Sequence, residues 1–324
     1  MPLFSLADLE AAVELVHASV PATPQFVWPM LAARTGAEVW VKHENHTPIG
    51  AFKIRGGLTY MDWLKRPGPK VRGVITATRG NHGQSIALAG RRAGLPVTIL
   101  VPHGNSVEKN AAMEGFGAEL IVHGRDFDEA EEHAAHLARE RKLHFVPSFD
   151  PLLVKGVATY ALELFRAVPD LHTVYAPIGM GSGICGLIAT RDLLGLATEI
   201  VGVVAEAAPA VALSVAAGHP VPTNSAATFA DGMACRDPHP EAVEIIRRGA
   251  ARVVRVSEDA IADAIRVYYA ATHNVAEGAG AAPLAALLAE RDRMAGKRVG
   301  LVLSGGNIDT DAFCAVLQGR TPVV

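Results

Sequence analysis

Residues 173–186 read TVYAPIGMGSGICG, a short β-branched run followed by a glycine-rich turn and a helical pattern. Strand, tight turn and helix in this order are typical of a parallel α/β sheet whose faces are covered by helices. The turn presents successive backbone N–H groups at the start of a helix, and such groups bind phosphate or carboxylate. These residues therefore predict an α/β fold with an anion site at the carboxyl end of a strand.

The same alternation of strand and helix runs along the rest of the chain. Its Val-, Ile- and Leu-rich runs lack polar alternation, as expected for strands buried on both faces of a parallel sheet. At 324 residues the chain is long enough for about two domains. We expect strands at 38–42, 73–76, 97–101, 119–122, 144–146, 173–176, 200–204, 252–256 and 298–303, and helices that include 81–93, 127–141, 151–166 and 258–272.

Charge, cysteine and hydropathy patterns argue against several classes of function. A net charge of −3 predicts no basic surface for nucleic acid. Cys185, Cys235 and Cys314 are too widely separated for a disulfide framework or a C-x-x-C zinc site. No Lys or Arg precedes Arg34, which is atypical of secretory and transit peptides, and the longest near-apolar run, 278–289, is too short to span a membrane. We therefore expect a cytoplasmic protein that acts on small molecules.

A second segment, HTPIGAFKIRGG at 46–57, places Lys53 after Phe52 at the expected start of a helix. The positive end of the helix dipole and partial desolvation both disfavour an ammonium, so Lys53 is a candidate amine nucleophile. A lysine at a helix start is also commonly a solvated surface residue. This segment alone leaves both interpretations open.

Two more segments follow expected strands and contain glycines. In TATRGNHGQS, 76–85, backbone N–H groups can hold an anion, Gly80 permits close approach of a ligand, and Asn81 can cap the helix or donate to a ligand oxygen. In LSGGNID, 303–309, Ser304 is expected to project from the end of the strand. A capped helix without a ligand and an ordinary tight turn are the respective alternatives.

The glycine turn also fits a dinucleotide-binding pattern. Gly181, Gly183 and Gly186 satisfy G-x-G-x-x-G, and Glu206 lies 20 residues beyond Gly186. An NAD-dependent oxidoreductase is therefore one alternative. It leaves the lysine, asparagine and serine segments unexplained, and the turn lies in mid-chain rather than at a domain start. The histidines show no metal-ligand spacing, so no metal site is predicted.

Taken together, the four segments resemble those of the serine/threonine dehydratase branch of the fold type II pyridoxal-phosphate enzymes, over about residues 21–309. GAFKIRGG resembles the family's S-F-K-x-R-G, TRGNHGQ its S-x-G-N-H-x-Q, GMGSG its tetraglycine loop and SGGN its S-G-G-N ending. The resemblance implies two α/β domains of the tryptophan synthase β type, with parallel or mixed sheets and pyridoxal 5′-phosphate between them. It implies a large domain at 1–51 and 148–324, a small mobile domain at 52–147, and no C-terminal regulatory domain.

The resemblance also implies roles for single residues. Lys53 is the implied catalytic residue, which holds the cofactor covalently, while Asn81 contacts its 3-oxygen and Ser304 its pyridine nitrogen. The implied cofactor-binding residues are Phe52, Lys53, Asn81, Gly179, Met180, Gly181, Ser182, Gly183, Glu277 and Ser304. The implied substrate-binding residues, around the α-carboxylate, are Thr78, Arg79, Gly80, Asn81 and His82.

Several positions depart from the family pattern. Ala51 replaces the serine before Phe-Lys, and Gly278 replaces the proline of E-P-A-G-A. The segment 202–205, GVVA, lacks the carboxylate of the G-V-E-P of metal-dependent relatives, which removes a metal ligand. Arg79 stands where the racemases of the family have a serine. A guanidinium cannot act as a base near neutral pH, so we expect elimination rather than racemisation.

The resemblance thus implies a lyase that removes water from a 3-hydroxy L-amino acid and gives a 2-oxo acid and ammonia, as in amino-acid catabolism. Threonine, serine, 3-hydroxyaspartate and phenylserine are all compatible substrates. A β-replacement enzyme and an amino-acid racemase are the alternatives that keep the same cofactor. A homodimer is implied on the same ground.

Overall fold

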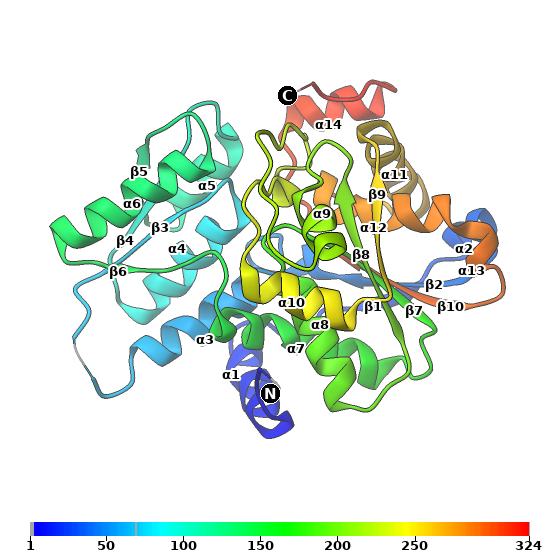
Figure 1. Ribbon diagram of the computed structural model, residues 1–324, viewed down its shortest axis with the longest axis horizontal. Coiled ribbons are helices and arrows are strands. Elements are labelled where there is room, and N and C mark those ends of the chain that lie inside the picture. The colour runs from blue at the N-terminus through cyan, green and yellow to red at the C-terminus, as the bar shows by residue number, and fades with distance from the viewer. Residues whose placement is uncertain (1–2, 69, 324) are drawn as a thin grey trace.

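The computed structural model describes residues 3–68 and 70–323 and contains two β-sheets that lie side by side (Figure 1). The strands are β1 Gln25–Val27, β2 Glu38–His43, β3 Val74–Ala77, β4 Val97–Val101, β5 Glu119–Val122, β6 His144–Phe145, β7 Thr173–Pro177, β8 Glu199–Ala205, β9 Arg252–Val256 and β10 Arg298–Leu303. The larger sheet has the order β1-β2-β10-β7-β8-β9 and the smaller the order β5-β4-β3-β6. All neighbouring strands are parallel except the β1–β2 pair. This confirms the expected α/β fold with two parallel or mixed sheets.

Helices connect and cover the strands, because parallel neighbours need crossover connections. The helices are α1 Leu6–His17, α2 Pro29–Thr35, α3 Ile54–Leu64, α4 Asn81–Ala93, α5 Val107–Gly115, α6 Phe127–Arg141, α7 Pro151–Ala167, α8 Ser182–Leu193, α9 Ala210–Ala217, α10 Pro240–Gly249, α11 Glu258–Thr272, α12 Gly278–Ala289, α13 Arg291–Met294 and α14 Thr310–Leu317, with two 3₁₀ helices, η1 Glu44–His46 and η2 Asp231–Met233.

The predicted elements agree closely with the observed ones. β4, β5, β9, β10, α4, α6 and α11 have the predicted bounds, and the other predicted elements shift by a residue or two at their ends. Strand β1 was not predicted; it pairs only with β2, at the edge of the sheet. Its three residues are partly or fully exposed, so the strand carries no buried hydrophobic run that could be recognised.

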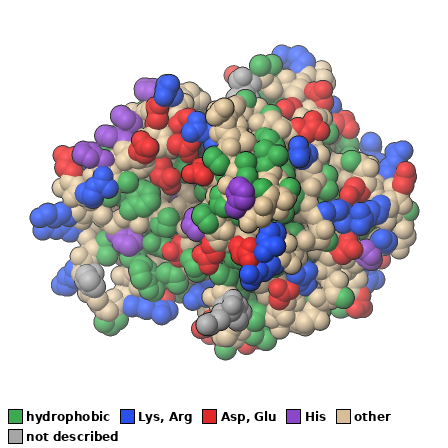
Figure 2. Space-filling model, viewed as in Figure 1, with side chains coloured by type: hydrophobic (Ala, Val, Ile, Leu, Met, Phe, Trp, Pro, Cys, Tyr) green, Lys and Arg blue, Asp and Glu red, His purple; other side chains and the backbone are tan. Residues whose placement is uncertain are grey.

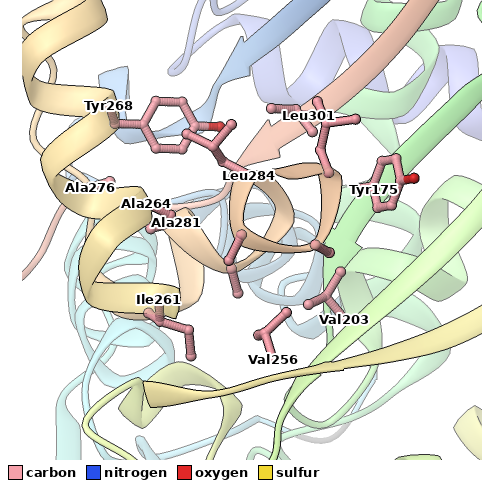
Figure 3. Close-up of a cluster of buried hydrophobic side chains, with 14 of the residues drawn as sticks. Tyr175, Val203, Val256, Ile261, Ala264, Tyr268, Ala276, Ala281, Leu284 and Leu301 are labelled. Carbon is pink, nitrogen blue, oxygen red and sulfur yellow. The ribbon is translucent and has the colours of Figure 1, made fainter. Parts of the chain in front are cut away.

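The near-apolar run 278–289 forms α12, a helix at the centre of the larger core. Every residue from Gly278 to Leu287 is buried. In Figure 3, Ala281 and Leu284 of this helix lie among Tyr175 and Val203 of the sheet and side chains of α11. Small residues let α12 approach the sheet closely, and a Cβ on Gly280 would lie 2.4 Å from the backbone oxygen of Gly305. This packing places the start of α12 beside the loop that follows β10.

A buried ion-pair network fixes the start of α3. Arg55 is fully buried and donates to Glu44 at 2.7 Å and to Glu163 of α7 at 2.6 Å. Glu163 also accepts from Lys42 of β2 at 2.6 Å. Buried charges are tolerated when they are paired in this way, and loss of one partner is costly. The network ties α3, and with it the preceding Lys53, to β2 and α7.

Acidic and basic side chains are interspersed over the face shown in Figure 2. Within the described residues, no helix combines the length and the apolar character needed to cross a membrane.

Candidate active site

All the predicted site residues line one cavity between the two sheets. They come from loops at the carboxyl ends of β3, β7 and β10, from the turn before α3, and from the start of α12. Parallel sheets place such loops together at one edge, which is why segments far apart in sequence converge. The predicted residues in the cavity wall are Phe52, Lys53, Thr78, Arg79, Gly80, Asn81, His82, Gly179, Met180, Gly181, Ser182, Gly183, Glu277 and Ser304.

Lys53 precedes the first residue of α3, and its amine points into this cavity. The backbone N–H of Phe52 donates to the backbone oxygen of Ser304 at 3.0 Å, which pins the segment to the loop after β10. Nζ of Lys53 donates to Oγ of Ser182 at 2.9 Å. Burial lowers the pKa of Lys53 to about 8. About a tenth of the Lys53 population is therefore free amine at pH 7, far more than for an ordinary lysine, and a nucleophile or base requires this form.

The turn after β7 has the geometry of an anion cradle. Gly181 has φ +99°, in the left-handed region that favours glycine, and immediately precedes α8. A Cβ on Gly179 would lie 2.3 Å from the backbone oxygen of Gly232. The first N–H groups of α8, at Ser182 and Gly183, have no acceptor within the helix and face the same cavity. Met180 and Ser182 therefore interrupt the glycines only at positions that accept a side chain.

The loop after β3 is shaped by Thr78, whose Oγ1 accepts from the backbone N–H groups of Gly80 at 2.9 Å and Gly83 at 3.2 Å. The N-cap of α4 is Gly80. The idea that Asn81 caps this helix is therefore wrong. Nδ2 of Asn81 instead donates to Oε1 of Glu277 at 2.7 Å, and Oδ1 accepts from Asn307 at 2.8 Å. One N–H of the Asn81 amide stays available for a ligand.

His82 is a neutral neighbour of this loop. Its Nε2 lies 3.1 Å from Oγ1 of Thr76. Burial, together with the positive charge of Lys53, lowers the pKa of His82 to about 3. The ring therefore adds no charge to the cavity near neutral pH.

Two charged residues in the cavity wall were not predicted. Nζ of Lys109, on α5, lies 2.6 Å from Oδ2 of Asp231 and 3.3 Å from Oε2 of Glu277. Burial alone would lower the pKa of Lys109, but these two carboxylates raise it, so the side chain stays an ammonium. Burial raises the pKa of Glu277, and Lys109 opposes that rise. Neither Lys109 nor Asp231 belongs to a short motif, so no local signal identifies them.

A second cavity of about 630 Å³ adjoins the first. The residues that line both cavities form the junction between them: Arg79, Phe127, Ser148, Met180, Ala234 and Cys235. We call this second space the outer cavity. Its wall includes much of the acidic cluster at 126–132. Arg236, also in this wall, pairs with Asp126 and Asp128 of the cluster. Among residues 3–68 and 70–323, no cluster of three or more His, Cys, Asp or Glu side chains has the arrangement of a metal site.

Comparisons with known proteins show which family the chain resembles. The family described as pyridoxal-phosphate dependent enzyme matches residues 18–305. L-threonine ammonia-lyase of Thermotoga maritima is 34% identical over 98% of this chain and 79% of its own length. The structure of threonine deaminase isoform 2 of Solanum lycopersicum superposes with a TM-score of 0.88 and 30% identity, over 98% of this chain and 95% of the other. The structure of a pyridoxal 5′-phosphate-dependent aspartate racemase superposes with a TM-score of 0.90 and 27% identity, over 95% of this chain and 97% of the other.

Proposed function

Because the chain belongs to the family of pyridoxal-phosphate-dependent enzymes, in its threonine/serine dehydratase branch, we propose that it removes water from 3-hydroxy L-amino acids and releases a 2-oxo acid and ammonia. The chain is a pyridoxal-phosphate-dependent lyase, and the family excludes the NAD-dependent alternative. The single observation that carries the reaction is the position of the Lys53 amine, which shares one cavity with two sets of free helix N–H groups.

The residues of the cavity fit this cofactor. The left-handed Gly181 and the close approach at Gly179 leave room and N–H donors for a phosphate. Lys53 supplies the amine for the aldehyde carbon, and we assign the Ser304 hydroxyl to the ring nitrogen and the free N–H of Asn81 to the 3-oxygen. When bound, the cofactor supplies an electron sink that acidifies the α-hydrogen of an amino acid.

Lys53 is the base in this proposal. Its pKa of about 8 leaves free amine available near neutral pH to take the α-proton. Oγ of Ser182 accepts a hydrogen bond from Nζ of Lys53 at 2.9 Å and orients it. Ser304 is neutral and cannot hold a ring nitrogen protonated as an aspartate would, which favours loss of the β-hydroxyl over slower side reactions.

The start of α4 is assigned to the α-carboxylate of the substrate. The backbone N–H groups of Gly80 and Gly83 are already bonded to Thr78, whereas those of Asn81 and His82 lie in the first helical turn, where N–H groups have no acceptor within the helix. Free N–H groups at a helix start bind a carboxylate favourably. We assign the β-substituent of the substrate to the side of Arg79, because the outer cavity adjoins the first cavity there.

Racemisation is the second candidate, because the aspartate racemase has a similar structure. Arg79 favours elimination, since its guanidinium cannot take a proton from the face opposite Lys53. Incubation of the holoenzyme with L-threonine should give 2-oxobutyrate and ammonia in equal amounts, while the remaining threonine stays L. Rapid appearance of D-threonine, or consumption of an added thiol in a β-replacement product, would contradict the proposal.

We also propose that 52–147 forms a small domain that moves relative to 1–51 and 148–324. Away from the cavity, α3 is held against α7 by the buried Arg55–Glu163 pair, so the movement we propose is on the cavity side. The contacts across the boundary there are polar: Lys109 bonds to Asp231, Ser106 to Asp309, and Arg236 to Asp126. Such contacts exchange with water more readily than a packed apolar interface does. The homodimer, the cytoplasmic location and the catabolic role stay predictions.

A further inference from the structure

Arg79 is a cation without a partner at the junction of the two cavities. Its Nε is buried and has no hydrogen-bond partner. Within the described part of the chain, no hydrogen bond or ion pair involves its guanidinium. By contrast, Lys109 pairs with Asp231 and Glu277, and Arg236 pairs with two aspartates. Arg79 is partly buried and its Nε lies out of contact with water, so the guanidinium is suited to a ligand anion.

The phosphate of the cofactor and the α-carboxylate of the substrate are already assigned to other groups. The glycine turn at 179–183 supplies N–H groups for a phosphate, and the start of α4 supplies them for an α-carboxylate. Arg79 lies between these donors and the outer cavity, on the side assigned to the β-substituent. We therefore propose that Arg79 determines substrate specificity by binding a second carboxylate, carried on the β-carbon of the 3-hydroxy amino acid. This assignment rests on the proposed function.

The outer cavity limits how long such a substrate is. Beyond Arg79, its wall carries Asp126, Asp128, Glu131 and Asp237, and Arg236 neutralises part of this charge. A carboxylate that extended past Arg79 would approach these acidic groups and be repelled. A carboxylate attached directly to the β-carbon stays beside the guanidinium, whose planar fork can bind both oxygens. The substrate class is therefore a short 3-hydroxy dicarboxylic amino acid, with 3-hydroxyaspartate as its simplest member.

A matched ligand pair tests the carboxylate preference without turnover. L-aspartate and L-asparagine have nearly the same shape, differ in charge at the distal group, and lack a β-hydroxyl to eliminate. In calorimetric titrations of the holoenzyme, we expect L-aspartate to bind at least tenfold more tightly than L-asparagine. Arg79→Gln should reduce this preference to less than about threefold, and Arg79→Lys should retain part of it. Equal binding of the two ligands by the unmodified enzyme would overturn the assignment, whether or not the variants fold.

Turnover then separates this inference from the proposed function. The value of kcat/KM for L-threo-3-hydroxyaspartate should exceed that for L-threonine at least tenfold, and Arg79→Gln should lower the first value at least tenfold more than the second. An enzyme that deaminates threonine or serine without this preference would refute the role of Arg79 and leave the proposed function intact. An enzyme that deaminates no 3-hydroxy amino acid would refute the proposed function and the substrate class with it, while the calorimetry would still decide whether Arg79 selects a carboxylate.

Discussion

Nζ of Lys109 lies 2.6 Å from Oδ2 of Asp231, so an ion pair joins α5 to η2 at the wall of the cavity. The cavity therefore contains two primary amines in opposite states. Lys109 is held as an ammonium by two carboxylates, whereas Lys53 has a hydroxyl partner and a pKa lowered by burial. Only an unprotonated amine attacks an aldehyde, so this difference supports the proposal that Lys53 is the attachment point for the cofactor.

Replacement of Lys53 by Ala should abolish covalent attachment and lower turnover by about 10³-fold or more, because the variant loses both the attachment amine and the base. Lys109 should not take its place, since Asp231 and Glu277 keep it protonated. Borohydride reduction followed by peptide mapping measures the attachment directly. We expect the cofactor-derived mass on the peptide that contains Lys53 in the unmodified enzyme, and on no lysine of the cavity in the variant. A modified Lys109 in that variant would show that the ion pairs do not control reactivity.

Lys109→Met should destabilise the folded protein by about 3 kcal/mol, because it leaves the buried carboxylate of Glu277 without its cation. Urea unfolding of the apoenzyme measures the loss, and Lys109→Arg, which keeps the charge, is the matched control. Burial raises the pKa of Glu277 in the folded state, and loss of Lys109 raises it further. Such a group stabilises the fold most below its unfolded pKa, and the benefit disappears as pH rises through the folded value. The destabilisation should therefore be larger at pH 8 than at pH 5; the opposite order would mean that Glu277 is not the affected group.

Gly181→Ala should weaken cofactor binding at least tenfold, since φ +99° disfavours any L side chain and the turn would distort. Gly195→Ala is a matched control: Gly195 also has positive φ, +64°, but nothing lies within 4 Å of its added Cβ. Gly195→Ala should cost about 1 kcal/mol of stability, and Gly181→Ala should cost more, because its added Cβ would lie 2.9 Å from Cβ of Ala242. Only Gly181→Ala should change the dissociation constant measured by equilibrium dialysis. A similar loss of cofactor affinity in both variants would mean that general instability, and not the glycine turn at 179–183, causes the loss.

Much of the site could be predicted because its parts are local. A strand that ends in a glycine turn before a helix is visible in the sequence, as at 173–186, and parallel topology brings such turns to one edge. Lys53, Asn81 and Ser304 therefore share a cavity although they lie far apart in the chain.

The parts that could not be predicted depend on contacts between distant residues. Lys109 and Asp231 are 122 positions apart, and Arg55 and Glu163 are 108 apart. Such pairs leave no periodicity or spacing in the sequence, because their partners are chosen by tertiary packing. The same limit applies to Asn81, whose side chain bonds to Glu277 rather than capping its own helix.

The rate at which the apoenzyme captures its cofactor should depend on pH through Lys53. With a pKa of about 8, the free-amine fraction rises nearly tenfold from pH 6 to pH 7 and levels off above about pH 9. Stopped-flow absorbance at a fixed low concentration of pyridoxal phosphate follows this capture. The amine of Nα-acetyl-lysine is the control, because its ordinary pKa near 10 should keep its rate rising well beyond pH 9. An apoenzyme whose rate continued to rise in parallel with this control would show that burial does not activate Lys53, and the amine would then have to be activated only after the cofactor has bound.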